Sequence, residues 1–196
     1  MIAIVDYGAG NLASVVKAIE HLGQPCAVTA DAAIVASAEQ LIIPGVGNFK
    51  ATLPLHDGRL GIAVREAITY RKPVLGICLG LQWMFEGSDE APELPGLRAF
   101  SGTCSRFPDR VKSPHVGWNR IEVAPRSRLL AGIPDGSYVY FTHSYRAPLC
   151  ADTVATCVYE APFTAAAERD NLFGLQFHPE KSGDVGIKIL ETFCAL

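Results

Sequence analysis

The stretch VLGICLG, residues Val74 to Gly80, carries the strongest structural signal in this chain. An apolar run that follows Pro73 stops abruptly at Cys78, which stands between two glycines, and helix-compatible residues continue from Leu81. This order predicts a buried strand, a sharp turn and a helix, with the cysteine at the turn. The pattern Gly-x-Cys-x-Gly has the form of a nucleophile elbow in which a thiol replaces the usual hydroxyl.

The surroundings of Cys78 favour a reactive thiol. A nucleophile on so tight a turn crowds the residues two positions away, and glycine relieves this crowding and tolerates unusual backbone dihedrals. The start of a helix also places free N–H groups and positive partial charge beside the sulfur, which favours the thiolate. The alternative is a buried core cysteine, which is the commoner fate of a free cysteine.

Length, charge and cysteine spacing exclude several classes of function. The 196 residues are enough for one α/β domain, 1–196, and no linker divides them. A net charge of −3 without a basic cluster excludes a nucleic-acid-binding surface, and no apolar stretch or N-terminal leader indicates a membrane or an export signal. Six scattered cysteines indicate reduced thiols in the cytoplasm, and neither they nor the five histidines have the spacing of metal ligands.

Hydrophobic periodicity predicts two halves with different secondary structure. The first half alternates strands at 2–7, 25–29, 41–43 and 74–77 with helices at 12–22 and 61–70. This alternation predicts a mainly parallel, doubly wound sheet. Beyond Gly87, prolines interrupt the chain and we expect antiparallel strands at 116–123, 137–145, 154–159, 163–168 and 172–177, with a last helix at 184–193. The expected fold is therefore α/β, with a mixed, mainly parallel sheet and an antiparallel extension.

A glycine-rich turn near the N-terminus resembles a nucleotide-binding motif. The stretch from Gly8 to Ala13 fits the dinucleotide pattern G-x-G-x-x-A, and Asp31 follows about twenty residues later. However, Asp6 would face the pyrophosphate, and no later segment supplies a dehydrogenase site. We therefore favour an ordinary tight turn into a helix.

The stretch PGVGN, from Pro44 to Asn48, directly follows the third expected strand. The carboxyl ends of parallel strands are where α/β sheets bind ligands, and acyl transfer needs donors aimed at the developing oxyanion. The N–H of Leu79, next after the nucleophile, is one candidate donor, and a backbone N–H of this loop, with Val46 favoured, is the other. The alternative is an ordinary turn between a strand and a helix.

The stretch FHPE, from Phe177 to Glu180, can supply a base. Proline biases His178 toward extended geometry, and residues two apart in an extended segment point the same way. Glu180 can then orient the imidazole so that it takes a proton from sulfur and later returns it to the leaving amine. Alone, His-Pro-Glu is typical of a surface turn; after an elbow it indicates a Cys-His-Glu triad.

These motifs, in this order and spacing, resemble the class I glutamine amidotransferases. Three further stretches, at 6–11, 114–119 and 141–145, narrow the resemblance to the glutaminase subunits of imidazole glycerol phosphate synthase, from histidine biosynthesis. The resemblance covers nearly the whole chain. It implies a flavodoxin-like amidotransferase fold, hydrolysis of glutamine to glutamate and ammonia through a glutamyl thioester, and no cofactor.

The resemblance also implies roles for individual residues. Cys78 would be the nucleophile, His178 the acid and base, and Glu180 its orienter. The glutamine substrate would contact Gly47, Gln82, Ser144 and Tyr145. A (βα)8-barrel cyclase subunit would receive the ammonia within a heterodimer and make imidazole glycerol phosphate and an aminoimidazole carboxamide ribonucleotide. The residues expected to face that partner are Asn11, Pro114, His115, Gly117, Trp118, Asn119, Tyr140 and Lys181.

Two other interpretations stay open at this point. One is a different amidase of the same fold, such as the glutaminase of pyridoxal phosphate synthesis, which lacks the Pro-His-x-Gly-Trp-Asn stretch and is therefore distinguished by Trp118. The other is a non-catalytic binding module, which a lost triad residue would indicate, whereas all three are present. Trp118 also has two possible roles: it can face a partner, or it can cap the core of this chain.

Overall fold

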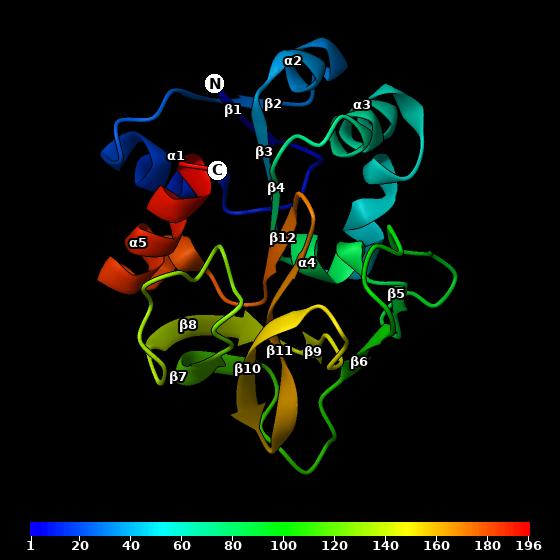
Figure 1. Cartoon of the computed structure of the whole chain (residues 1–196). Helices are drawn as coiled ribbons and strands as arrows, with labels where there is room; N and C mark the ends of the chain where they lie inside the picture. The colour runs from blue at the N-terminus through cyan, green and yellow to red at the C-terminus, as the bar shows by residue number, and fades with distance from the viewer.

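The computed structural model describes residues 1–196, which form a nine-stranded sheet of order β2-β1-β3-β4-β12-β11-β10-β7-β8 (Figure 1). The parallel half contains β1 (Ile2–Val5), β2 (Cys26–Thr29), β3 (Gln40–Gly45), β4 (Val74–Cys78) and β12 (Leu172–Leu175). The antiparallel half contains β7 (His115–Val123), β8 (Tyr138–His143), β10 (Thr153–Tyr159) and β11 (Ala161–Arg169). A small second sheet contains β5 (Gly87–Ser88), β6 (Thr103–Arg106) and β9 (Tyr145–Arg146).

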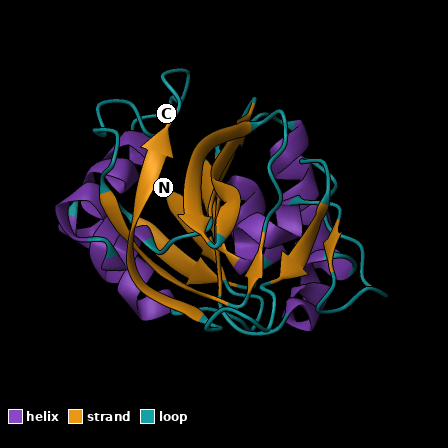
Figure 2. Ribbon diagram, turned by 90° about the horizontal axis from the view of Figure 1, so that it is seen from below, coloured by secondary structure: helices purple, strands orange, loops and turns teal.

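Helices cover both faces of the parallel half (Figures 1 and 2). One face packs against α1 (Leu12–His21) and α5 (Gly183–Cys194). The other face packs against α2 (Ala32–Ser37), α3 (Gly58–Thr69), α4 (Leu79–Met84) and the 3-10 helix η1 (Phe49–Leu55). A second 3-10 helix, η2 (Pro179–Lys181), directly precedes α5. Not one of these helices has both the length and the apolar character needed to cross a lipid bilayer.

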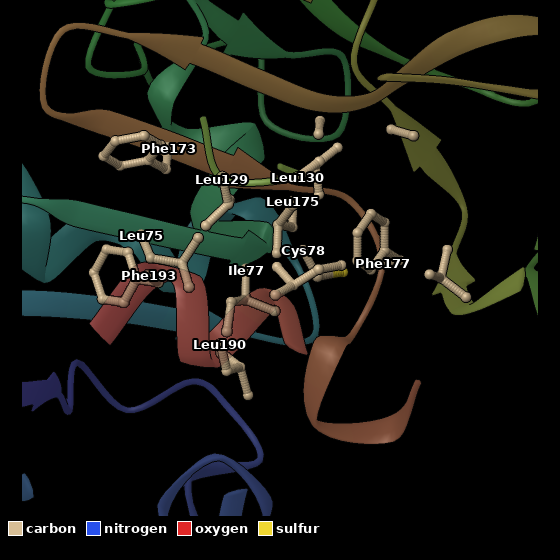
Figure 3. Packing of buried hydrophobic residues seen from close by; sticks show 14 of the residues in the cluster. Leu75, Ile77, Cys78, Leu129, Leu130, Phe173, Leu175, Phe177, Leu190 and Phe193 are labelled. Carbon is tan, nitrogen blue, oxygen red and sulfur yellow. The ribbon is translucent and has the colours of Figure 1, made fainter. Parts of the chain in front are cut away.

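The strand that ends at Cys78 is fixed by the core on the α5 side. Figure 3 shows Leu75 and Ile77 of β4 facing Leu190 and Phe193 of α5, with Cys78 at the end of the same strand. These apolar side chains are buried almost completely. Because burial of each contributes about 1.5–3 kcal/mol, Cys78 lies on one of the most firmly held parts of the sheet.

Strand register brings the separate sequence motifs to one edge of the sheet. Gly45 at the end of β3 lies opposite Cys78 in β4, and Leu175 at the end of β12 lies opposite Ile77 on the other side of β4. The segments that follow β3 and β12 therefore flank the elbow at the carboxyl edge, where parallel sheets bind ligands.

The expected α/β fold with its antiparallel extension is confirmed, but some expected elements are wrong. The strand expected over 137–145 is divided at Ser144, whose carbonyl accepts a hydrogen bond from the Phe107 N–H at 3.0 Å. Helices α2 and η1 were not anticipated. Asp31, weighed as a nucleotide-binding acid, caps α2 by accepting the Ala33 N–H at 2.8 Å, so Gly8 to Ala13 is the turn into α1 that we favoured.

Candidate active site

The backbone at Cys78 is strained, as an elbow requires. Its φ of 53° and ψ of −102° lie outside the regions that non-glycine residues normally adopt. A Cβ on Gly76 would lie 2.7 Å from the backbone of Gly80, and one on Gly80 would lie 2.0 Å from the Ile43 carbonyl oxygen. The two glycines are therefore needed for close backbone approach, as the sequence predicted, and they leave a Cys78 side chain that is only 5% exposed.

His178 and Glu180 form a buried pair. The Nδ1 atom of His178 lies 2.7 Å from Glu180 Oε1, and both side chains are almost completely inaccessible to solvent. The expected contact is present, but the expected geometry is wrong, because residues Pro179–Lys181 form η2. Only His178 itself is extended, with φ −98° and ψ 98°. The 3-10 turn, and not strand alternation, brings the carboxylate back to the imidazole.

The protonation of His178 follows from its two neighbours. Burial lowers its pKa, but the Cys78 thiol and the Glu180 carboxylate outweigh burial and raise the pKa to about 10. The Nε2 atom of His178 is buried, and Cys78 is the one group that raises the pKa of the ring from the side opposite Glu180. With its pKa raised this far, the imidazole holds a proton on Nε2 at neutral pH while Nδ1 is held by the carboxylate, and this proton is available for the leaving nitrogen.

Two polar groups that sequence reasoning missed contact the sulfur of Cys78. The Gln176 Nε2 group donates to Sγ at 3.7 Å, and Sγ lies 3.9 Å from the Thr142 carbonyl oxygen. Gln176 precedes the FHPE stretch and is completely buried. The one sign of this contact in the sequence is a glutamine at the end of an otherwise apolar strand. Such a side chain is expected to be buried, and a buried polar side chain needs a partner.

A cavity of about 190 Å³ opens above the elbow. Every residue expected to bind glutamine or the oxyanion lines it, together with Glu90, Pro114, Thr142 and His143. The complete lining is Val46, Gly47, Cys78, Leu79, Gln82, Glu90, Pro114, Thr142, His143, Ser144 and Tyr145. The parallel half thus supplies Cys78, and the antiparallel half supplies the opposite wall.

Two acceptor groups in this cavity suit a ligand ammonium group. The amide N–H groups of Gln82 donate to the Tyr145 carbonyl at 2.9 Å and to Gln176 Oε1 at 3.3 Å, which leaves the Gln82 oxygen for a ligand. Burial raises the pKa of Glu90, although its carboxylate accepts the Phe49 N–H at 2.7 Å and this bond opposes the rise. Glu90 lies in an acidic loop without a motif, so no feature of the sequence selects it.

The two expected oxyanion donors lie on adjacent segments beside Cys78. Leu79 is the first residue of α4, where backbone N–H groups have no partner within the helix. Val46 directly follows Gly45, the residue opposite Cys78, and is 37% exposed. Gly47 has a φ of 96°, a conformation that favours glycine, so the loop can turn its peptide groups close to the cavity.

An aromatic and basic patch lies beside the turn that carries His178 and Glu180, because the His178 N–H donates to the Tyr140 carbonyl and Lys181 ends η2; we call Trp118, Tyr140 and Lys181 the Trp118 patch. Trp118 is 55% exposed, and its ring meets the Tyr140 ring edge-on with centroids 6.1 Å apart. The Lys181 ammonium lies 5.9 Å from the centroid of the Tyr140 ring. This exposure overturns the alternative that Trp118 caps the core of the chain.

The other residues expected to face a partner differ in accessibility. Pro114 is exposed, whereas Asn11, Gly117 and Asn119 are half-buried. His115 is only 4% exposed and stacks on Tyr159 with a centroid distance of 4.0 Å. Its side chain points into the protein, so a direct contact of this imidazole with a partner is ruled out.

Comparisons with known proteins agree with this geometry. The family model described as "Glutamine amidotransferase class-I" matches residues 3–195. The protein named imidazole glycerol phosphate synthase subunit HisH from Thermococcus kodakarensis is 46% identical, with 98% of each chain covered. The protein of the same name from Dechloromonas aromatica is also 46% identical, covering 98% of this chain and 94% of its own.

Solved structures share the fold at lower identity. A crystal structure titled glutamine amidotransferase matches with a TM-score of 0.77 and 16% identity, covering 99% of this chain and 100% of its own. The glutaminase domain of CTPS from Trypanosoma brucei matches with a TM-score of 0.69 and 15% identity, covering 99% and 93%. With relatives above 40% identity along almost the whole chain, the choice among amidotransferases of this fold is settled. The chain belongs to the class I glutamine amidotransferases and, within them, to the HisH subunits of imidazole glycerol phosphate synthase.

Proposed function

We propose that this glutaminase subunit hydrolyses glutamine to glutamate and ammonia with Cys78 as nucleophile, His178 as acid and base, and Glu180 as its orienter. The observation that carries the proposal is the strained, buried thiol beside the buried His178–Glu180 pair, at the base of a cavity of about 190 Å³. A cavity of this size suits an amino acid, because drug-sized ligands occupy larger pockets.

The reaction proceeds in two acyl-transfer steps. His178 Nε2 takes the proton of the Cys78 thiol, and Sγ attacks the carboxamide carbon of glutamine to give a tetrahedral intermediate. The N–H groups of Leu79 and Val46 hold the oxyanion. His178 returns the proton to the leaving nitrogen, so that ammonia departs and a glutamyl thioester forms. Water, deprotonated by His178, attacks the thioester, and glutamate leaves as the thiol regains its proton.

Selection of glutamine follows from the polar groups of the cavity wall. The Gln82 oxygen and the Glu90 carboxylate accept hydrogen bonds from the α-ammonium group, and this contact also offsets the burial of Glu90. The segment Ser144–Tyr145 and Gly47 enclose the amino-acid end from the other side. A carboxamide held this way reaches Sγ, whereas a shorter amino acid would not fill the cavity.

The ammonia passes to a (βα)8-barrel cyclase in a heterodimer, and the Trp118 patch is the contact surface. Large exposed aromatic side chains beside a cation are typical interface anchors. Pro114 lines the cavity and directly precedes β7, the strand that carries Trp118, so the docking surface adjoins the glutamine site. We place this chemistry in the cytoplasm, because a catalytic thiol must stay reduced.

The test compares Cys78→Ala with Cys26→Ala, which alters a half-buried cysteine on β2, far from the elbow. In the complex with the cyclase, Cys78→Ala should lose detectable glutamate release while melting like the wild type. The same complex should still form imidazole glycerol phosphate from added ammonium salt. Cys26→Ala should keep both activities. Glutamine turnover by Cys78→Ala would overturn the covalent mechanism.

A further inference from the structure

A line of hydrogen bonds leads away from the nucleophile into the antiparallel half. It begins at Cys78 Sγ and passes through Gln176 to Gln82, whose amide donates to the Tyr145 carbonyl at 2.9 Å. The same carbonyl oxygen lies 2.8 Å from Nδ1 of His143. The Tyr145 carbonyl is therefore shared between the residue that faces the ligand and a buried histidine, which no step of the mechanism uses.

The line continues across the strand pair β7–β8. His143 Nε2 lies 3.1 Å from His115 Nδ1, and His115 Nε2 lies 3.3 Å from the amide nitrogen of Asn119. That amide nitrogen also donates to the Val158 carbonyl at 3.1 Å. The line thus ends at the residue next to Trp118, on the strand that carries the Trp118 patch.

Both ends of the line require the same arrangement of hydrogens. A carbonyl oxygen only accepts, so His143 Nδ1 must carry a hydrogen toward Tyr145. At the other end, Asn119 Oδ1 accepts the Arg120 N–H at 2.8 Å, which turns the amide N–H groups toward His115 and Val158. Each imidazole therefore carries its hydrogen on Nδ1, and its Nε2 atom accepts a hydrogen bond. A second proton on either ring would bring two N–H groups face to face.

The surroundings also disfavour a charge on either ring. His115 lies between the rings of Tyr159 and Phe141, at centroid distances of 4.0 and 4.9 Å, and His143 lies 5.2 Å from Phe107. Burial lowers the pKa of His115 to about 4. Burial also lowers the pKa of His143 to about 3; the Tyr145 carbonyl opposes this shift, and His115, His178 and Arg146 add to it.

We propose that His143 and His115 are positioning residues for glutamine binding: as neutral rings with fixed tautomers, they hold the Tyr145 carbonyl and, through it, the ligand-facing amide of Gln82. The inference rests on the proposed function, because it assigns these rings to the glutamine site. It needs no proton transfer along the line. The hydrogen at His143 Nδ1 is the essential feature, and the His115 ring fixes where that hydrogen resides.

The first test compares two variants of His143 in the complex with the cyclase. Leucine has a similar size and no donor, so His143→Leu should raise the KM for glutamine about tenfold, as expected for one lost hydrogen bond, while kcat falls less. Asparagine places an amide N–H where Nδ1 lies, so His143→Asn should recover most of the affinity. The rate at which iodoacetamide alkylates Cys78 should stay unchanged in both variants.

A second variant and a spectrum cover the case in which His143→Leu does not fold. His115→Phe keeps the stacking on Tyr159 and removes the donor to His143, and it should raise KM in the same direction. Long-range ¹H–¹⁵N correlation spectra of the full chain should show both histidines neutral at pH 7, with the hydrogen on Nδ1. Equal KM values for His143→Leu and His143→Asn, or a hydrogen on His143 Nε2, would overturn the inference. A wild-type complex without glutaminase activity would instead refute the proposed function before any histidine variant is made.

Discussion

The position of Glu180 depends on a glycine that carries no chemistry itself. Gly186 lies in the first turns of α5, and a Cβ at this position would come within 1.9 Å of the Pro179 carbonyl oxygen in η2. That distance is about 1.5 Å short of ordinary van der Waals contact, in an interior that is packed without free space. The change Gly186→Ala must therefore displace the turn that holds Glu180 against His178.

The size of the effect follows from two opposing contributions. Alanine in a helix interior is favoured over glycine by about 0.5–1 kcal/mol, whereas overpacking costs about 1–3 kcal/mol. We expect Gly186→Ala to lower the free energy of unfolding by about 1–2 kcal/mol. Because a misplacement of about 1 Å can reduce the rate about a hundredfold, the kcat for glutamine should fall by that order.

A matched control separates stability from catalysis. Gly61 lies in α3, and a Cβ there would come 2.8 Å from the Leu55 carbonyl oxygen, away from the triad. Denaturant unfolding and glutaminase kinetics of the complex should show a stability loss in both variants, but a loss of kcat only in Gly186→Ala. If Gly186→Ala is destabilised and keeps its kcat, the prediction is refuted, because the close packing of α5 on η2 then does not position the triad.

The electrostatics of the pair and the patch give two more predictions. Because the folded pKa of His178, about 10, exceeds its ordinary 6.5, the folded chain binds more protons there. The stability that this gives is complete below about pH 6.5 and is lost as the pH rises through 10; unfolding measured across this range should show a flatter profile for Glu180→Gln. Trp118→Ala should weaken binding to the cyclase more than tenfold by calorimetry, while the free chain melts normally; a lowered melting temperature with unchanged affinity would contradict this.

Local features of the chain were predictable, whereas contacts made by strand order were not. The elbow was visible because its glycines and its cysteine lie within five residues, and local sterics require that pattern. Glu90 lines the cavity and Gln176 contacts Cys78 Sγ, each from a segment that carries no motif, and only the arrangement of the strands brings them to the site. Those contacts depend on pairing across the whole sheet, which periodicity does not specify.

One incorrect expectation had a signal in the sequence. The resemblance placed His115 and Trp118 on one surface, but residues three apart in a strand point to opposite faces. In β7 the side chain of His115 is buried and that of Trp118 is exposed, in agreement with this alternation. Strict use of the two-residue period would have assigned His115 to the interior, beside the cavity wall.

The site is divided between two halves of the sheet, and the division explains why the two positioning tests should differ. The proposed nucleophile, Cys78, lies at the end of β4, on a rigid core. The His178 backbone is tied to β8, because its N–H donates to the Tyr140 carbonyl at 2.9 Å and its carbonyl accepts the Ser182 hydroxyl at 2.6 Å.

Gly186→Ala disturbs the turn that carries His178 and Glu180. It therefore moves the His178 imidazole relative to the Cys78 thiol and should reduce kcat. His143→Leu leaves Cys78 and the backbone contacts of His178 in place. It loosens only the cavity wall that faces the substrate, so it should raise KM. The two effects are separable because the reacting groups are held by η2 and the elbow, whereas the hydrogen bonds from Tyr145 to Asn119 position the Gln82 amide that faces the substrate. If Gly186→Ala and His143→Leu changed kcat to the same extent and KM to the same extent, the two halves of the sheet would move as one body.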